Sequence, residues 1–213
     1  MNPDPDFERP PLPSALVAQR LLVVLRGLSL DAVNEVARSL AAEGISIIEV
    51  TLDSPQALEA IAAVRAGLAD TVTVGAGTID SLAGAKLAVE AGANFLVAPH
   101  TDREVIKWAV EHGIPTLPGA LTPTEIAEAW WAGASAVKIF PASAVGPSFL
   151  RALPGFLRNI PLIPTGGIDA ENALSYLQSG ATALGVGGWL IGDANSAGIA
   201  QRARELTDAI ASS

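Results

Sequence analysis

One lysine inside an apolar stretch is the residue of this chain best suited to covalent chemistry. Lys138 lies between the β-branched residues Val137 and Ile139 in the segment AVKIFP, residues 136–141. If residues 135–140 form a strand, side-chain alternation places Lys138 on the face opposite these two neighbours. Burial of an ammonium costs several kcal/mol and favours the neutral amine, which attacks ketones to form a Schiff base. The alternative is a lysine whose ammonium reaches solvent or pairs with a carboxylate.

A glutamate stands in the same setting on another apolar run. Glu49 alternates with Ile48 and Val50, as Lys138 alternates with its neighbours. Both ionisable groups are therefore expected to project into the interior from one mouth of the fold. A carboxylate beside an amine can shuttle protons, whereas the alternative is a structural salt bridge to Lys138 or Arg26. The two roles are compatible.

The elements that must position these residues follow a repeating pattern of a short apolar run and a helix-like segment. We expect helix caps at Ser29, Ser54, either Asp80 or Ser81, Thr122 and Asp169, and helix ends at Gly44, Gly92, Gly113, Gly133 and Gly180. Eight repeats favour parallel strands in an α/β, (β/α)8 TIM barrel, a fold whose lower size limit is about 200 residues. An open doubly wound sheet is the alternative. The expected strands are 21–25, 45–50, 72–76, 95–98, 115–117, 136–140, 162–164 and 183–186.

The chain is predicted to form one domain over residues 1–213. Its 213 residues are 50% hydrophobic and 16% charged, and no linker or low-complexity block divides them. The proline-rich residues 1–13 are expected to be an irregular arm. Residues 14–20 are expected to form a short helix that closes the bottom of the barrel.

Composition excludes several classes of function. A formal charge of -9 argues against nucleic-acid binding, which depends on clustered Lys and Arg. The absence of cysteine excludes disulfides and thiolate catalysis, and only two histidines, His100 and His112, disfavour a metal centre, although carboxylate-bound magnesium stays open. We expect no metal and no cofactor. No apolar run is long enough to span a bilayer, and no signal peptide is recognisable, so we expect a cytoplasmic protein without a membrane partner.

The residues after the predicted strands are unusually polar for so apolar a chain. In a barrel the active site lies at the carboxyl ends of the strands. Glycine-rich turns after the last two strands can bind phosphate through backbone N–H groups, or can serve turn geometry alone. The residues expected at this mouth are Arg26, Glu49, Thr78, Pro99, His100, Gly119, Lys138, Thr165, Gly166, Gly167, Gly187 and Gly188.

Six motifs together resemble the 2-keto-3-deoxy-6-phosphogluconate (KDPG) aldolase and 4-hydroxy-2-oxoglutarate aldolase family. They occur in the family's order and spacing between about residue 22 and residue 190. The motifs are IEVTL at 48–52, VGAGT at 74–78, AP at 98–99, LPG at 117–119, VKIFPA at 137–142 and PTGGI at 164–168.

The resemblance implies a class I aldolase of the Entner–Doudoroff type. Such an enzyme cleaves 2-keto-3-deoxy-6-phosphogluconate reversibly to pyruvate and glyceraldehyde 3-phosphate, without metal. Lys138 matches the Schiff-base lysine, and Glu49 matches the carboxylate that moves protons through a water. The positions that match substrate-contacting residues of the family are Arg26, Thr78, Pro99, Phe140, Thr165, Gly166, Gly167, Gly187 and Gly188.

Two positions depart from the gluconate pattern of that family. Asp53 stands where many members carry an arginine, and Gly188 stands where a serine is common. An anion at position 53 would repel a phosphorylated substrate, whereas backbone N–H groups can compensate for one lost hydroxyl. The stretch LDSP at 52–55 is also similar to the galactonate branch, so the galactonate epimer or 4-hydroxy-2-oxoglutarate are alternative substrates. We expect Asp53 to face substrate hydroxyls.

Adjacent tryptophans suggest a partner subunit. Trp130 and Trp131 point about 100° apart on a helix, so both cannot easily share one buried face and one can be exposed for a partner subunit. The alternative is that the edges of both pack in the layer between the helix and the barrel. The resemblance implies a homotrimer, in which one of them is covered. A catalytically weak assembly or scaffold relative is the alternative of another class. The retained pair of Lys138 and Glu49 favours the enzyme, because a scaffold has no need of a buried amine.

Overall fold

The protein has an α/β fold whose parallel strands form a curled sheet. The computed structural model describes residues 8–68, 71–192 and 196–212. Six strands form one parallel sheet in the order β5-β4-β3-β2-β1-β9, and three form a second in the order β6-β7-β8. The strands are β1 (Leu21–Leu25), β2 (Ile47–Thr51), β3 (Thr73–Gly77), β4 (Leu96–Val97), β5 (Thr116–Leu117), β6 (Gly119–Ala120), β7 (Val137–Ile139), β8 (Leu162–Pro164) and β9 (Leu184–Val186).

Backbone contacts connect the two sheets at both sides. On one side Thr165, directly after β8, forms a parallel bridge with Gly185 of β9. On the other side β5 and β6 are consecutive and are separated only by Pro118, which has no N–H to donate. The carbonyl of Pro118 accepts from Lys138 N of β7 at 2.9 Å. All the strand pairs within the two sheets are parallel.

The predicted strands agree with these elements apart from small shifts at their ends. β1 and β8 have the predicted bounds, and the others shift or shorten by one or two residues. The sequence pattern missed β6, because Pro118 and Gly119 are residues that usually mark a turn.

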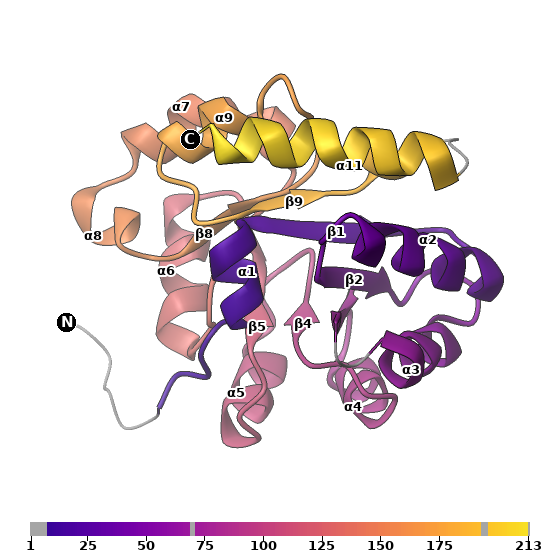
Figure 1. Cartoon of the computed structure of the whole chain (residues 1–213). Coiled ribbons are helices and arrows are strands. Elements are labelled where there is room, and N and C mark those ends of the chain that lie inside the picture. The colour runs from indigo at the N-terminus through magenta and orange to yellow at the C-terminus, as the bar shows by residue number, and fades with distance from the viewer. Residues whose placement is uncertain (1–7, 69–70, 193–195, 213) are drawn as a thin grey trace.

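The helices surround the strands on the outside. Figure 1 shows α2, α3 and α4 following one another along one side, with α11 running across β9 and beside α2. The helical segments are α1 (Ser14–Gln19), α2 (Leu30–Ala42), α3 (Ala57–Leu68), α4 (Leu82–Glu90), α5 (Arg103–Glu111), α6 (Pro123–Ala132), the 3-10 turn η1 (Ala142–Ala144), α7 (Gly146–Ala152), α8 (Gly155–Arg158), α9 (Ala173–Gln178), α10 (Gly188–Ile191) and α11 (Ser196–Ala211).

Three of the predicted helix caps are confirmed and two are wrong. Ser29, Ser81 and Thr122 accept backbone N–H bonds at the starts of α2, α4 and α6. Ser54 is not a cap, because α3 begins at Ala57 and the Ser54 hydroxyl is bonded elsewhere. Asp169 is not the cap of α9 either. Its carboxylate accepts from the N–H of Asn172 at 2.9 Å, inside a turn that precedes the helix.

The glycines predicted at helix ends all adopt the left-handed conformation. Their φ angles are positive, a region that residues with a Cβ rarely occupy. They are Gly44, Gly92, Gly113, Gly133 and Gly180.

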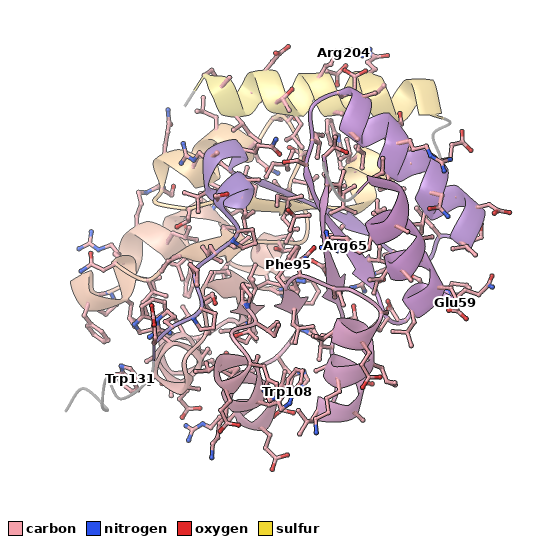
Figure 2. All side chains as sticks on the ribbon, turned by 60° about the horizontal axis from the view of Figure 1, so that its bottom comes forward. Glu59, Arg65, Phe95, Trp108, Trp131 and Arg204 are labelled. Atoms are coloured by element: carbon pink, nitrogen blue, oxygen red, sulfur yellow. The ribbon has the colours of Figure 1, made fainter. Side chains whose placement is uncertain are left out.

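Two apolar clusters lie on the two faces of the curled sheet. The larger lies between strands and helices and holds the outward residues, such as Val137 and Ile139 of β7. The smaller holds inward residues of the strands, including Leu22 and Phe95, both almost fully buried. Figure 2 shows Phe95 in the middle of the molecule, whereas Trp108 and Trp131 lie toward its periphery.

The short helix predicted near the N-terminus is confirmed as α1. Its Leu16 is fully buried and joins the inner cluster, with Leu12 and Ala15 packed against it. Figure 1 shows α1 lying across the strands at one end. Residues 8–13 of the predicted arm contain no helix or strand, and residues 1–7 lie outside the described residues.

Among the described residues, no helix is long and apolar enough to cross a membrane.

Candidate active site

Lys138 and Glu49 meet inside the curled sheet. The Nζ of Lys138 lies 3.8 Å from Oε1 of Glu49, and their side chains are 4% and 0% exposed. Neither carboxylate oxygen of Glu49 has a hydrogen-bond partner in the part of the chain that the structure describes. A buried carboxylate without such bonds is unusual, since buried polar atoms are nearly always bonded. The two carboxylate oxygens of Glu49 in this pair can therefore still accept hydrogen bonds.

Strand geometry explains why the two groups point inward. Val137 and Ile139 belong to the outer cluster, so alternation turns Lys138 to the inner face of β7. On the neighbouring strand of Glu49, a glycine leaves the room that its carboxylate occupies. A Cβ added at Gly77 would overlap the Glu49 carboxylate.

Burial sets the protonation of the carboxylate. Desolvation raises the pKa of Glu49, and the charges of Lys138 and Arg26 act in the opposite direction without outweighing it. The negative charge of Asp53 adds to the increase. A carboxyl group with a raised pKa exchanges protons nearer to neutral pH than an ordinary glutamate does, which suits it to general acid–base work.

A pocket of about 680 Å³ opens beside Lys138. This volume is typical of sites for small molecules. Its walls come from the ends of β1, β7, β8 and β9 and from α10. The lining residues are Val24, Arg26, Gly27, Leu28, Lys138, Phe140, Thr165, Gly166, Gly167, Ile168, Asp169, Gly185, Gly187, Gly188, Trp189, Ile191 and Gly192.

The structure brings most of the predicted site residues to this pocket. Four of them, Glu49, Asp53, Thr78 and Pro99, are outside the set of lining residues. Glu49 reaches the pocket through its contact with Lys138, and both Asp53 and Thr78 contact Arg26. The backbone of Pro99 packs closely against Gly119 instead. The predicted residues that line the pocket are Arg26, Lys138, Phe140, Thr165, Gly166, Gly167, Gly187 and Gly188.

The arginine at the pocket is held by two neighbours. Arg26 Nη2 donates to Thr78 Oγ1 at 3.0 Å, and its Nη1 lies 3.7 Å from Oδ2 of Asp53. The side chains of Arg26 and Asp53 are 50% and 45% exposed, so water screens this pair. Thr78 has a φ of 55°, which a threonine adopts at a cost of about 1–3 kcal/mol. This strained backbone presents its hydroxyl to Arg26.

A buried hydrogen-bond network connects the loops that carry Arg26 and Asp53. The N–H of Gly27 donates to Ser54 Oγ at 2.8 Å, and Ser54 Oγ lies 2.9 Å from Thr51 Oγ1. Because Thr51 and Ser54 are buried, the network ties the loop after β1 to the end of β2. Ser54 therefore joins the loops at the site and does not cap α3.

The glycine turn after β8 lies close to the strand that carries the lysine. Gly166 and Gly167 have φ angles of 91° and 79°. A Cβ at Gly166 would lie 3.3 Å from the Phe140 ring, and one at Gly167 would crowd Ser143. At Gly188 a Cβ would meet nothing within 4 Å, so a serine would fit there without displacing any neighbour.

Some pocket residues escaped the sequence analysis. Trp189 and Asp169 both line the pocket, and the sequence indicated no site role for either of them, only a helix cap for Asp169. Their types carry no chemical signal by themselves, and the strand ends that bring them together are distant in sequence. His100 is exposed and is not a lining residue. His112 ends α5, with Nδ1 2.7 Å from the carbonyl oxygen of Trp108.

Within residues 8–68, 71–192 and 196–212 no group of three or more His, Cys, Asp or Glu is arranged to hold a metal ion.

Comparisons with known proteins point to one family. The model of the aldolase family "KDPG and KHG aldolase", in which KHG is 4-hydroxy-2-oxoglutarate, matches residues 13–202. The chain is 38% identical over 156 residues to 2-dehydro-3-deoxy-phosphogluconate aldolase of Treponema pallidum, covering 73% of this chain and 74% of that protein. It is 35% identical over 200 residues to a probable 2-dehydro-3-deoxy-6-phosphogalactonate aldolase of Rhizobium meliloti, covering 92% and 93%.

A solved structure gives the same result. The 2-keto-3-deoxy-6-phosphogluconate aldolase of Zymomonas mobilis superposes with a TM-score of 0.83 at 30% identity, covering 91% of this chain and 95% of that chain. The residues that the family model matches include both Glu49 and Lys138. The chain belongs to the KDPG and KHG aldolase family, whose members are carbon–carbon lyases.

Proposed function

We propose that the protein is a class I aldolase that forms a Schiff base between Lys138 and the ketone of a 2-keto-3-deoxy sugar acid. The observation that carries this proposal is the buried contact of Lys138 with Glu49 at the pocket. A buried amine without a covalent task costs stability, because burying an ammonium is unfavourable even beside a carboxylate. A nucleophilic amine needs an adjacent group that accepts and returns protons. Glu49 is close enough to Lys138 for one water to carry protons between Glu49 and the reacting carbon.

The reaction divides into steps that balance in atoms and charge. The amine of Lys138 attacks the C2 carbonyl, and Glu49, through a water, moves protons so that the carbinolamine loses water to give an iminium. The iminium draws the electrons of the C3–C4 bond when that bond breaks, while the C4 hydroxyl gives its proton, through the water, to the Glu49 carboxylate and the C4 fragment leaves as an aldehyde. The enamine then takes a proton at C3 and is hydrolysed to pyruvate, which frees Lys138. No metal or cofactor enters these steps.

Other residues are proposed to hold the substrate around this centre. Thr78 would contact the pyruvyl part, and Pro99 with Phe140 would wall the site. The cation–π distance of 5.2 Å between Lys138 Nζ and the Phe140 ring supports the place of Phe140 beside the reacting carbon. Backbone N–H groups of the two glycine turns would bind the carboxylate or phosphate. The residues of these turns are Thr165, Gly166, Gly167, Gly187 and Gly188.

We propose 2-keto-3-deoxy-6-phosphogluconate as the substrate, with glyceraldehyde 3-phosphate as the second product. The relatives divide between gluconate, galactonate and 4-hydroxy-2-oxoglutarate aldolases, so the galactonate epimer and 4-hydroxy-2-oxoglutarate are the alternatives. The contact of Asp53 with Arg26 favours 4-hydroxy-2-oxoglutarate, which carries no phosphate, because it neutralises the cation that would attract one. Asp53, which contacts Arg26, is proposed to face the hydroxyls of the substrate.

We infer that the strands close into one (β/α)8 barrel that forms a single domain. The bridge of Thr165 with Gly185 supports closure between β8 and β9, and the bond from Lys138 N to Pro118 O supports closure between β5 and β7. The inner cluster around Phe95, sealed by α1, supports it further, since a closed barrel is filled with side chains.

The active form is proposed to be a cytoplasmic homotrimer. Trp131 of α6 is 40% exposed, which is unusual for so large an apolar side chain, and a partner subunit would cover it. A phosphorylated sugar acid does not cross membranes because of its charge, so the proposed substrate implies a reaction in the cytoplasm. A scaffold role without catalysis is disfavoured by the buried pair at the pocket.

Trapping with pyruvate tests the mechanism. The chain has three lysines, Lys86, Lys107 and Lys138, so reduction with borohydride in the presence of pyruvate has few possible targets. Intact mass spectrometry should show one reduced pyruvyl adduct, which is lost in Lys138→Met and retained in the control Lys107→Met, an exposed lysine of α5. An unmodified chain after reduction, or an adduct that persists in Lys138→Met, would overturn the proposal.

A further inference from the structure

One wall of the pocket is formed by a very short helix. Gly187 and Gly188, then Trp189 and Ile191–Gly192, all line the pocket, and they include the four-residue helix α10 and its flanks. One turn of helix does not hold itself together in water, because nucleation fixes several dihedrals for a single hydrogen bond. The position of this wall must therefore come from contacts outside the helix.

Arg202 of α11 supplies two of these contacts. Its Nε donates to the carbonyl of Leu190 at 2.9 Å, and its Nη2 donates to the carbonyl of Ile191 at 3.1 Å. The last carbonyls of a helix have no partner within it, and a cation at this end is also favourable for the helix dipole. The planar guanidinium binds both carbonyls at once in a fixed geometry, whereas the ammonium of a lysine stands on a flexible stem and has no such rigid fork.

The neighbours of this contact keep the arginine in place. Ile199, Ala203 and Leu206 of α11 are buried in the outer cluster, so the helix that carries Arg202 is anchored on the strands. On the other side, Gly192 has a φ of 49°, and a Cβ there would lie 3.5 Å from Nη2 of Arg202. Glycine at position 192 thus lets the chain turn beneath the guanidinium.

We propose that Arg202 is a positioning residue that fixes α10 as a wall of the pocket and thereby sets the affinity for the distal part of the substrate. The inference rests on the proposed function. The pyruvyl carbons are bound to Lys138, so the remaining carbons and their charged end occupy the rest of the pocket, including the part lined by Gly187 and Gly188. Lys138 and Glu49 stand on β7 and β2, whereas Arg202 bonds to the carbonyls at the end of α10, so we expect the chemistry at C2 not to depend on Arg202.

Hydrogen exchange tests whether Arg202 fixes α10 in place, and it does not depend on a measurement of activity. In Arg202→Ala the amides of residues 187–192 should exchange at least about tenfold faster than in the unchanged chain, because two carbonyl contacts are lost. The matched control is Arg204→Ala on the same helix. Arg204 pairs with Glu43, directly after α2, and does not line the pocket, so the exchange of 187–192 should stay unchanged.

Kinetics test the consequence for the substrate. Arg202→Ala should raise the KM of the sugar acid substrate about tenfold and should change kcat by no more than about twofold. The reason is that the variant loses binding that is equal in the ground state and the transition state, whereas the chemical step is unaffected. Pyruvate trapping on Lys138 should remain at the level of the unchanged chain. Arg202→Lys keeps the charge but loses the planar fork of donors, so its KM should lie between that of the unchanged chain and that of Arg202→Ala. Arg204→Ala should leave KM and kcat unchanged.

The outcomes separate this inference from the proposed function. Unchanged exchange and unchanged KM in Arg202→Ala overturn the role of Arg202, whether or not pyruvate is trapped. A parallel fall of kcat, pyruvate trapping and the unfolding midpoint would show a purely structural residue and also overturns it. If the unchanged chain traps no pyruvate, the aldolase proposal fails instead, and the exchange of residues 187–192 alone decides whether Arg202 holds the wall.

Discussion

Gly77 and Glu49 stand so close that any side chain at position 77 would occupy the place of the Glu49 carboxylate. The two residues lie on the neighbouring strands β3 and β2, and both are fully enclosed. The glycine is therefore part of the site although it carries no chemistry. It creates the space in which a carboxylate can face Lys138.

Replacing this glycine should damage catalysis more than folding. Gly77→Ala pushes the Glu49 carboxylate away from Lys138, and loss of a positioned general acid–base group costs about 10²–10⁴-fold in rate. Steady-state kcat should fall by at least about a hundredfold. The control is Gly67→Ala in α3, where a Cβ meets nothing within 4 Å, and its kcat should not change. Equal activity of Gly77→Ala and the unchanged chain would show that the position of Glu49 is not limiting.

The buried carboxylate should make stability depend on pH. Burial raises the pKa of Glu49 above its ordinary value of 4.5, so the folded chain keeps this proton after the unfolded chain has lost it. The contribution of Glu49 to stability therefore falls as the pH rises from 4.5, and levels off above the folded pKa. Glu49→Gln does not titrate. Urea unfolding should show the stability of Glu49→Gln, relative to the unchanged chain, increasing with pH over this window. A constant difference would contradict the raised pKa.

Asp53 should influence the choice between substrates. Asp53→Asn removes the negative charge that faces Arg26. A unit charge about 8 Å from a substrate phosphate repels it in water by about 0.5 kcal/mol, or roughly twofold in affinity. The ratio of kcat/KM for the phosphorylated sugar acid to that for 4-hydroxy-2-oxoglutarate should rise about twofold or more at low salt, and less at high salt. Glu59→Gln, an exposed carboxylate on α3 (Figure 2), is the control. An unchanged ratio in Asp53→Asn would remove Asp53 from substrate discrimination.

Phe95 should be essential for the stability of the inner cluster. Its side chain is fully buried and packs where Gly75 leaves room for its ring. Phe95→Ala should lower the free energy of unfolding by about 3–5 kcal/mol, because a cavity remains. Phe156→Ala, at a side chain that is 62% exposed, should change it by less than about 0.5 kcal/mol. Denaturant unfolding of both variants should follow a single transition, whereas two separate transitions would contradict a single domain.

Trp131 should be covered in the oligomer. Its neighbour Trp130 is already engaged, because the Arg9 guanidinium lies 3.5 Å from the centroid of its ring. Trp131→Asp places a charge in the proposed interface, so light scattering should show the mass of one chain where the unchanged protein has the mass of three. Val17→Asp, at an exposed residue of α1, should keep the larger mass. A trimer that survives Trp131→Asp would place the interface elsewhere.

Local rules explain what the sequence alone could predict. The alternation of Val137, Lys138 and Ile139 predicts which way the lysine points, since successive strand residues face opposite sides. The turn glycines and the caps at Ser29, Ser81 and Thr122 follow from conformational preferences within a few residues. The parallel pairing of the strands follows from the alternation of these local strand and helix units. The sequence therefore predicted most residues of the site, although not the contacts between them.

Tertiary structure decided the contacts between distant segments. Ser54 has the composition of a helix cap, yet it bonds to Gly27, because the loop after β1 offers an N–H at the right distance. Arg202 gives no signal in the sequence, and its importance appears only where α11 crosses the end of α10. The sequence by itself determined which residues face the interior and which chemistry they allow. Only the curled sheet, which brings β2 and β7 face to face, decided that Glu49 meets Lys138, because contact between non-neighbouring strands depends on packing and not on local preference.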